Sequence, residues 1–345
     1  MSGEAFRAAI RRQRGSHTPV WFMRQAGRYM AEYRAIRARA SLLEICHRPE
    51  LACEVTLQPV EHIGVDAAII FADILLPFEP LDLGLTFSAG EGPVIARPLR
   101  TAQQVSRLRS LDPERDLGYV LEAIRLSVKA LDGKVPLIGF AGAPFTLASY
   151  AIEGGATRNF VETKRLMYGD PETWHALLDR LATIVGHYLA AQGRAGAECL
   201  QLFDSWVGCL SPADYRRYVQ RHSAKAIGLA RAGGVPVIHF GTGTNTFLDA
   251  MAEAGGDVLG VDWRIPLDEG WESFPDRGIQ GNLDPCALFA PLPELKRQVR
   301  DIMDRAAGKP GHIFNLGHGI LPDTDPARVR AVVSMVHEHS AARSD

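Results

Sequence analysis

Two arginines four residues apart, Arg24 and Arg28, are the first residues whose type and spacing point to chemistry. They lie in the segment Met23–Tyr29, after the apolar Trp21 and with Gly27 between them. If the chain turns helical here, both guanidinium groups lie on one face, and two planar forks suit a ligand with several carboxylates. Glycine would permit a close backbone approach. We therefore expect an anion site, the alternative being a pair of surface arginines.

Four further polar residues stand near the ends of apolar runs. Asp73 follows the run 68–72, where a carboxylate is either catalytic or paired to a basic neighbour. If it is buried, its charge needs hydrogen-bond donors. Tyr150 and Ser205 would supply hydroxyl groups, although either one alone also fits a core polar group. His318 has glycine on both sides, which favours a functional role.

The elements that must position these residues are short apolar runs bounded by Gly or Pro, which predict buried strands. Because helical stretches separate them, we expect a single-domain (β/α)8 TIM barrel over residues 1–345, with the active site at the carboxyl ends of the strands. An open doubly wound sheet is the structural alternative. The predicted strands are Pro19–Arg24, Asp66–Leu75, Val135–Gly142, Glu198–Ser205, Val235–Gly241, Val258–Trp263, Gly278–Asn282 and His312–Gly317, the seventh being the weakest.

The predicted helices have apolar residues at helical spacing, and two have good amino-terminal caps, Ser211-Pro212 and Asp325-Pro326. The Gly- and Pro-rich stretch Pro77–Pro98 is too long for a tight turn and is interpreted as a lid or rim loop. The predicted helices are Ala102–Arg109, Asp116–Leu131, Pro171–Gly193, Ser211–Ala232, Thr246–Ala254, Pro291–Ala307 and Pro326–His339.

Composition excludes several classes of function. The 345 residues have a net charge of −2, which gives no general attraction to nucleic acid or to an anionic membrane, although residues 1–48 hold ten Arg and only three Glu. Five cysteines without a C-x-x-C pair are typical of a reduced, cytosolic protein. No run of 18 or more apolar residues is present, so we expect no membrane span and a cytoplasmic location. No His and Cys fall at zinc spacing, so we expect no metal site.

Several ordered segments together resemble the uroporphyrinogen decarboxylase family. The resemblance runs from about residue 6 to about residue 340, and such an ordered set is far more specific than any one motif. One departure is Ala72, where many relatives carry Ser before the aspartate. The segments are Pro19–Tyr29, Phe71–Leu75, Gly139–Tyr150, Gln201–Trp206, Gln280–Pro285 and Phe314–Ile320.

The resemblance implies a homodimeric barrel that acts without a metal or organic cofactor. The implied substrate is uroporphyrinogen III, a reduced tetrapyrrole whose four acetate side chains are decarboxylated to give coproporphyrinogen III in haem biosynthesis. Asp73 would accept hydrogen bonds from the pyrrole N–H groups, and Arg24 and Arg28 would hold carboxylates, with Arg24 also passing a proton. The other implied substrate contacts are Gln25, Ala26, Gly27, Tyr150, Ser205 and His318.

Two other functions remain open. A related barrel methyltransferase would share the fold but use thiolate–zinc chemistry, and the absence of a His-x-Cys spacing counts against it, since Gly241 stands two residues after His239. A non-catalytic tetrapyrrole-binding protein would need the arginines but not Asp73 with its hydroxyl neighbours.

Overall fold

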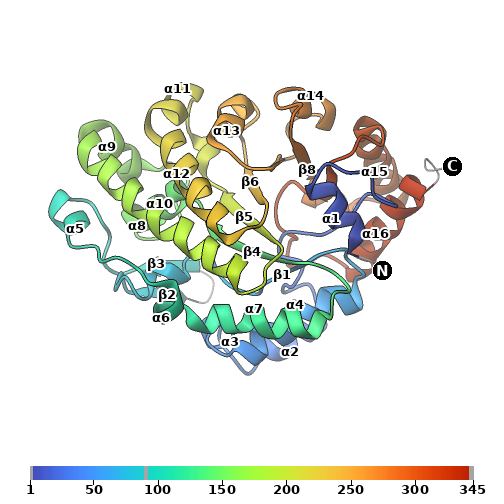
Figure 1. Ribbon diagram of the computed structural model, residues 1–345, viewed down its shortest axis with the longest axis horizontal. Coiled ribbons are helices and arrows are strands. Elements are labelled where there is room, and N and C mark those ends of the chain that lie inside the picture. The colour runs from blue at the N-terminus through green and yellow to red at the C-terminus, as the bar shows by residue number, and fades with distance from the viewer. Residues whose placement is uncertain (1–2, 89–91, 342–345) are drawn as a thin grey trace.

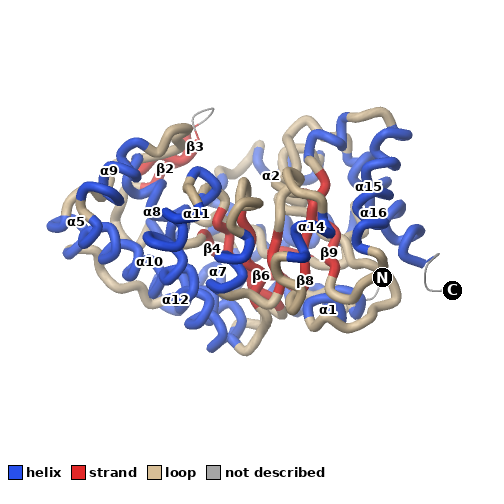
Figure 2. Tube along the Cα trace, turned by 90° about the horizontal axis from the view of Figure 1, so that it is seen from above, coloured by secondary structure: helices blue, strands red, loops and turns tan. Residues whose placement is uncertain are grey.

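The central sheet of the protein is parallel and follows the chain in order. A computed structural model describes residues 3–88 and 92–341. Figure 2 shows the strands in the middle of the molecule with helices around them. The sheet order is β1 (Ala68–Ile69), β4 (Leu137–Gly142), β5 (Cys199–Asp204), β6 (Val237–Gly241), β7 (Val258–Gly260), β8 (Gly278–Leu283) and β9 (His312–Leu316).

The segment around Val20 closes this sheet into a barrel between β9 and β1. Val20 forms an isolated parallel bridge with Phe314 in β9. The Phe314 N–H donates to the carbonyl oxygen of Pro19 at 2.9 Å, and the Asp66 N–H donates to that of Val20 at 2.7 Å. These bonds supply the eighth position of the barrel and confirm the (β/α)8 fold expected from the sequence.

Helices connect the strands and cover the outside of the barrel (Figure 1). The seven helices predicted from the sequence are all present within a few residues, except that a π-helical turn at Tyr215–Val219 interrupts the one after β5. The α-helices are α1 (Glu4–Ile10), α2 (Ala31–Arg37), α3 (Leu42–Cys46), α4 (Pro49–His62), α5 (Ala102–Ser106), α6 (Pro113–Asp116), α7 (Gly118–Leu131), α8 (Pro144–Glu153), α9 (Val161–Gly169), α10 (Pro171–Arg194), α11 (Pro212–Asp214), α12 (Gln220–Ala230), α13 (Leu248–Ala254), α14 (Leu267–Glu272), α15 (Leu292–Ala306) and α16 (Pro326–Ala341).

Sequence reasoning missed α1, α2, α3, α9 and α14, and also α4 and α8, which it missed for different physical reasons. Helix α4 contains Pro59, which normally ends a helix because it lacks an N–H donor. In α8 every residue from Pro144 to Ser149 is buried, so the helix has no polar face to show a period. Both helices begin with proline at the first helical position, which is the signal that remained readable.

Four predicted elements differ from the structure. The strand predicted at Pro19–Arg24 is reduced to the isolated bridge at Val20, because the chain turns out of the barrel at Arg24. The strand predicted at Asp66–Leu75 shrinks to the two residues of β1, because the chain leaves the sheet before Asp73. The strand that looked weakest, at Gly278–Asn282, is the fully buried six-residue β8. The stretch Pro77–Pro98 contains an antiparallel hairpin, β2 (Leu85–Ser88) with β3 (Gly92–Ile95), rather than a plain loop. Residues 89–91 of that stretch lie outside the described residues.

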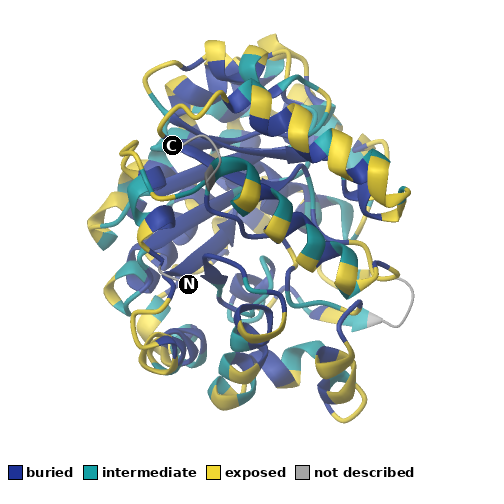
Figure 3. Cartoon of the chain, turned by 90° about the vertical axis from the view of Figure 1, so that its right-hand side faces the viewer, coloured by how far each residue is buried: buried dark blue, intermediate teal, exposed yellow. Residues whose placement is uncertain are grey.

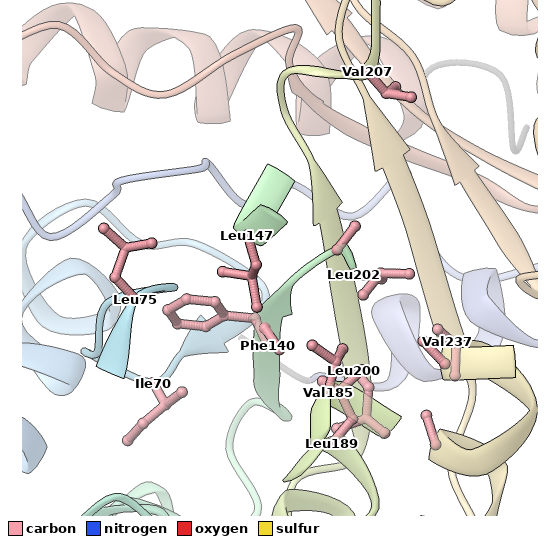
Figure 4. Packing of buried hydrophobic residues seen from close by; sticks show 14 of the residues in the cluster. Ile70, Leu75, Phe140, Leu147, Val185, Leu189, Leu200, Leu202, Val207 and Val237 are labelled. Carbon is pink, nitrogen blue, oxygen red and sulfur yellow. The ribbon is translucent and has the colours of Figure 1, made fainter. Parts of the chain in front are cut away.

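The core has two parts, one between the helices and the sheet and one inside the barrel. Figure 3 shows the strands buried and the outer faces of the helices exposed. The larger part includes Phe140, Leu147 and Leu75, which Figure 4 labels. The barrel interior is filled by a smaller cluster that includes Trp21, whose indole N–H donates to Gln280 at 2.9 Å. Such a filled barrel holds the strand ends rigidly.

Within residues 3–88 and 92–341, no helix is long and apolar enough to cross a bilayer.

A pair of glycine substitutions tests how closely the strand ends pack. A Cβ atom on Gly317, which follows β9, would lie 2.6 Å from the backbone nitrogen of Trp263, so Gly317→Ala forces the backbone to move. We expect it to lower the free energy of unfolding by about 2 kcal/mol. The control is Gly228→Ala in α12, where the new methyl group meets nothing within 4 Å.

Because an exposed helical glycine is less favourable than alanine, Gly228→Ala should raise stability by about 1 kcal/mol. Urea unfolding of both variants gives the comparison. Equal stabilities for Gly317→Ala and the wild type would show that this approach is looser than described.

Candidate functional site

Arg24 is held at the barrel mouth by its backbone and by the loop after β9. Its φ is +59°, in the left-handed region, where the chain turns out of the barrel. A Cβ atom on Gly319 would lie 2.5 Å from Cδ of Arg24, so the arginine side chain runs directly over this glycine. The Ile320 N–H donates to the carbonyl oxygen of Met23 at 2.9 Å and locks the two segments together. Arg24 therefore lies beside His318.

The segment that follows Arg24 is not the helical turn that the sequence analysis considered for placing Arg24 and Arg28 on one face. Residues 25–30 form turns and bends, and α2 begins only at Ala31. Gly27 lies close to the carbonyl oxygen of Arg24, which a Cβ atom would approach to 3.0 Å. Arg28 is exposed on this segment, and Ala26 is partly buried. Arg24 therefore reaches the site because its side chain packs over Gly319, and not because it lies on a helix face with Arg28.

The side chain of Gln25 stabilises the backbone beside the site through hydrogen bonds. Its side chain is buried, and its Oε1 accepts the Phe22 N–H at 3.0 Å. Its amide nitrogen donates to the carbonyl oxygen of Ala67 at 3.0 Å. The side-chain amide thus joins the turn after the first barrel position to the residue before β1, and it positions the neighbouring arginines.

Asp73 lies beyond β1, partly buried, where its carboxylate is poorly solvated. Its Oδ1 accepts the Leu75 N–H at 2.8 Å. Burial raises the pKa of Asp73, the Leu75 N–H and the positive charge of Arg24 oppose this, and Glu79 adds to it. The net pKa is raised above the usual value. The carboxylate therefore gains from any further donor or cation placed beside it.

The phenol of Tyr150 interacts electrostatically with both Asp73 and Arg24. It lies in α8 and stacks on Trp206, with ring centroids 3.8 Å apart. Burial raises the pKa of Tyr150 to about 12, the negative charge of Asp73 contributes, and Arg24 acts in the opposite direction. The phenol is therefore neutral at physiological pH and available as a hydrogen-bond donor.

His318 is a neutral imidazole with a defined tautomer. Burial lowers its pKa to about 4, and the positive charges of Arg24 and Arg264 add to that effect, while Asp262 opposes it. The Gly319 N–H donates to Nδ1 at 2.7 Å, so the ring proton is on Nε2. His318 can thus donate one hydrogen bond to an anion without carrying charge.

Ser205 stands at the carboxyl end of β5 and is partly buried. Its carbonyl oxygen accepts the hydroxyl of Thr242, which fixes the backbone there. The serine lies next to Trp206, on which Tyr150 stacks. Arg24, Asp73 and Tyr150 therefore lie close enough to interact electrostatically. Ser205 and His318 follow the carboxyl ends of β5 and β9, at the same end of the barrel.

Sequence reasoning missed Arg264. Its guanidinium lies 4.3 Å from the centre of the Trp263 ring and pairs with the buried Asp262. Its charge also lowers the pKa of His318. The readable signal was a basic residue just after the acidic end of the sixth predicted strand. His239, which was considered from the sequence, is buried in β6. Asp284 accepts the Cys286 N–H and so caps the turn after β8.

The basic amino-terminal stretch is only partly directed at the site. Arg7 pairs with Glu198 at 2.7 Å. Arg34 donates to the carbonyl oxygen of Arg28 at 2.9 Å. These arginines serve the fold, so the excess of positive charge near the amino end does not by itself measure the anion site.

Polar side chains at the carboxyl ends of parallel strands define a β/α-barrel enzyme site. The model of one family, uroporphyrinogen decarboxylase (URO-D), matches residues 1–339. A uroporphyrinogen decarboxylase from Carboxydothermus hydrogenoformans is 54% identical over 339 residues, 98% of this chain and 97% of that protein. The one from Sorangium cellulosum is 56% identical, covering 97% and 96%. The chain belongs to the uroporphyrinogen decarboxylase family.

The barrel is also shared with more distant proteins. A methyltransferase from Methanosarcina mazei superposes with a TM-score of 0.79 at 20% identity, covering 97% of each chain. At that identity the likeness shows the fold alone.

The buried carboxyl group of Asp204, beneath the site at the end of β5, makes stability depend on pH. Burial raises its pKa to about 7, although the Thr146 hydroxyl donates to it at 3.0 Å. The folded protein therefore holds a proton that the unfolded chain releases near pH 4. Stability contributed by the neutral form is lost as pH rises from about 4 to about 7, by at most about 1.4 kcal/mol per pH unit.

Asp204→Asn should remove this pH dependence, because the amide stays neutral. Chemical unfolding at pH 5 and pH 8 measures it, with the exposed Asp276→Asn as the control. The variant should lose less stability than the wild type between the two pH values. An identical loss in both proteins would mean that Asp204 is already ionised at pH 5.

Proposed function

We propose that this chain is a carboxy-lyase that converts uroporphyrinogen III to coproporphyrinogen III by removing carbon dioxide from four acetate side chains. The observation that carries the proposal is the partly buried Asp73, electrostatically coupled to Arg24 and Tyr150 at the barrel mouth. Full-length likeness to uroporphyrinogen decarboxylases supports the substrate. Each decarboxylation replaces a carboxylate by a proton, so one proton is consumed for each carbon dioxide released.

The chemistry needs an electron sink, because breaking the bond to the carboxylate leaves an electron pair on the acetate carbon. A pyrrole protonated at a ring carbon accepts that pair. The exocyclic carbon is then protonated to a methyl group and the ring carbon releases its proton, so the net consumption is one proton. Asp73 accepts hydrogen bonds from pyrrole N–H groups and offsets the positive charge on the protonated ring. In a poorly solvated pocket such a fixed charge is worth more than in water.

The remaining site residues bind and orient carboxylates. Arg24 and Arg28 hold side-chain carboxylates of the substrate, and Arg24 passes the proton to the ring. Tyr150 and Ser205 offer hydroxyl groups, and His318 offers its Nε2–H. Ala26 and Gly27 contribute backbone at the same edge, and Gln25 acts by holding that edge in place.

The proposal extends to the state of the protein. It acts as a single domain spanning residues 1–345 and as a homodimer, for which the half-exposed Phe289 and Leu292 offer apolar contact surface. A cytoplasmic location is supported by the five cysteines, all within the described ranges and all free.

Incubation of purified protein with uroporphyrinogen under anaerobic conditions, with no cofactor added, tests the proposal. Chromatography of the products should show coproporphyrinogen, with four carbon dioxide molecules released for each substrate consumed. Substrate that binds but returns unchanged would instead indicate a tetrapyrrole-binding protein.

Asp73→Asn keeps the shape of the side chain and removes its charge. We expect kcat to fall about 100-fold or more, because the fixed negative charge no longer offsets the cationic ring. The control is Asp132→Asn, an exposed residue in the left-handed conformation that asparagine also adopts. A near wild-type rate for Asp73→Asn would remove Asp73 from the centre of the mechanism.

Arg28→Ala should weaken substrate binding about tenfold, because a charge-assisted hydrogen bond to a carboxylate is lost. The matched control is Arg39→Ala, which removes the same charge from an exposed position in the same basic stretch. Substrate affinity of both variants is measured by steady-state kinetics. Equal affinities in Arg28→Ala and Arg39→Ala would assign Arg28 to the surface.

A further inference from the structure

Three side chains of metal-ligand type meet at the opposite end of the barrel from the proposed active site. His17 precedes the first barrel position, Asp66 precedes β1, and His337 lies in α16. Because Asp73 follows β1 and Asp66 precedes it, the two carboxylates mark opposite ends of the strands. Among residues 3–88 and 92–341, this trio is the one group of at least three such side chains whose ligand atoms converge, all within 4.8 Å of one another.

The three side chains point their ligand atoms at one another. Nε2 of His17 lies 3.1 Å from Oδ1 of Asp66, and Nε2 of His337 lies 2.7 Å from Oδ2. The two imidazole rings are 4.4 Å apart at 66°, so they do not stack face to face. Ligands at about 2.0 Å from a tetrahedral zinc ion are separated by about 3.3 Å. The observed separations need only small side-chain movements to admit an ion.

The carboxylate of this trio is buried, whereas the two imidazole rings reach solvent. The side chain of Asp66 is 1% exposed, and those of His17 and His337 are 20% and 30% exposed. A buried carboxylate oxygen therefore lies next to two imidazole nitrogens that solvent can reach.

The surroundings hold these ligands in orientation. Oδ2 of Asp66 accepts the Val20 N–H at 2.8 Å, and Nδ1 of His17 is 3.0 Å from the hydroxyl of Ser16. Such outer contacts orient metal ligands. A cavity of ≈ 800 Å³ is lined by Ser16, His17 and Thr18, so it reaches the trio on the His17 side.

We propose that His17, Asp66 and His337 bind one first-row divalent transition-metal ion, such as Zn²⁺, with water completing its coordination. Two imidazole nitrogens and one carboxylate oxygen suit such an ion and disfavour Mg²⁺ and Ca²⁺, which select oxygen ligands. The ion would join the amino-terminal segment, β1 and the carboxyl-terminal helix. Its role is structural and separate from the decarboxylation, which involves the other end of the barrel.

Metal titration of the full chain, after treatment with a chelator, tests this site. Isothermal titration with Zn²⁺ should show one bound ion per chain, and Mg²⁺ should show none. His17→Gln and His337→Gln should each weaken Zn²⁺ binding more than about tenfold, because each removes a nitrogen ligand. His187→Gln, at an exposed position on α10, is the matched control and should bind like the wild type.

Glutamine can still donate a hydrogen bond to Asp66, so both variants keep the tie between the segments. Zn²⁺ should raise the Tm of the wild type and not that of either variant. An absence of stoichiometric Zn²⁺ binding to the wild type would overturn the proposal and leave a hydrogen-bonded trio. Zn²⁺ binding by both variants with the affinity of the wild type would overturn it as well. Neither result bears on the decarboxylase assay, because that assay is run without added metal.

Discussion

The partial burial of a carboxylate, Asp73, is the constraint on which the proposed site depends. Burial disfavours the charged form, and the Leu75 N–H and the positive charge of Arg24 act in the opposite direction. The same environment that makes the charge unfavourable makes it effective, because a fixed charge in a poorly solvated pocket interacts strongly with charge that develops nearby. A cationic tetrapyrrole intermediate bound next to Asp73 would offset the unfavourable burial of this negative charge.

The barrel scaffold holds Arg24 and Asp73 close enough to interact electrostatically. Arg24 leaves the barrel in a left-handed turn and runs over Gly319, so the loop after β9 determines its direction. Gln25 ties that turn to the residue before β1, the strand that leads to Asp73. Tyr150 is carried by a helix that is buried along most of its length, which leaves little freedom for its ring. The geometry of the proposed site thus follows from barrel closure.

The barrel and its strand order were predictable, because buried strands are a local signal, and the ordered motifs showed the family. The roles of the candidate site residues stay predictions. The strand ends were not predictable, since the chain leaves the sheet at Arg24 and before Asp73 for reasons of tertiary contact. The helix imagined around Arg28 is absent because the turn at Arg24 and the packing of Gly27 override local spacing. The His17–Asp66–His337 trio could not be found either, because it depends on residues brought together only by the fold.

The electrostatic coupling between Arg24 and Asp73 is the central claim, and the titration of the Asp73 carboxyl group measures it directly. Carbon-13 NMR of carboxyl-labelled protein, assigned by comparison with Asp73→Asn, would follow this group with pH in the wild type and in Arg24→Gln. The pKa of Asp73 should lie above the usual aspartate value in the wild type and should rise further in Arg24→Gln, because the opposing positive charge is gone. The same midpoint in both proteins would contradict the account.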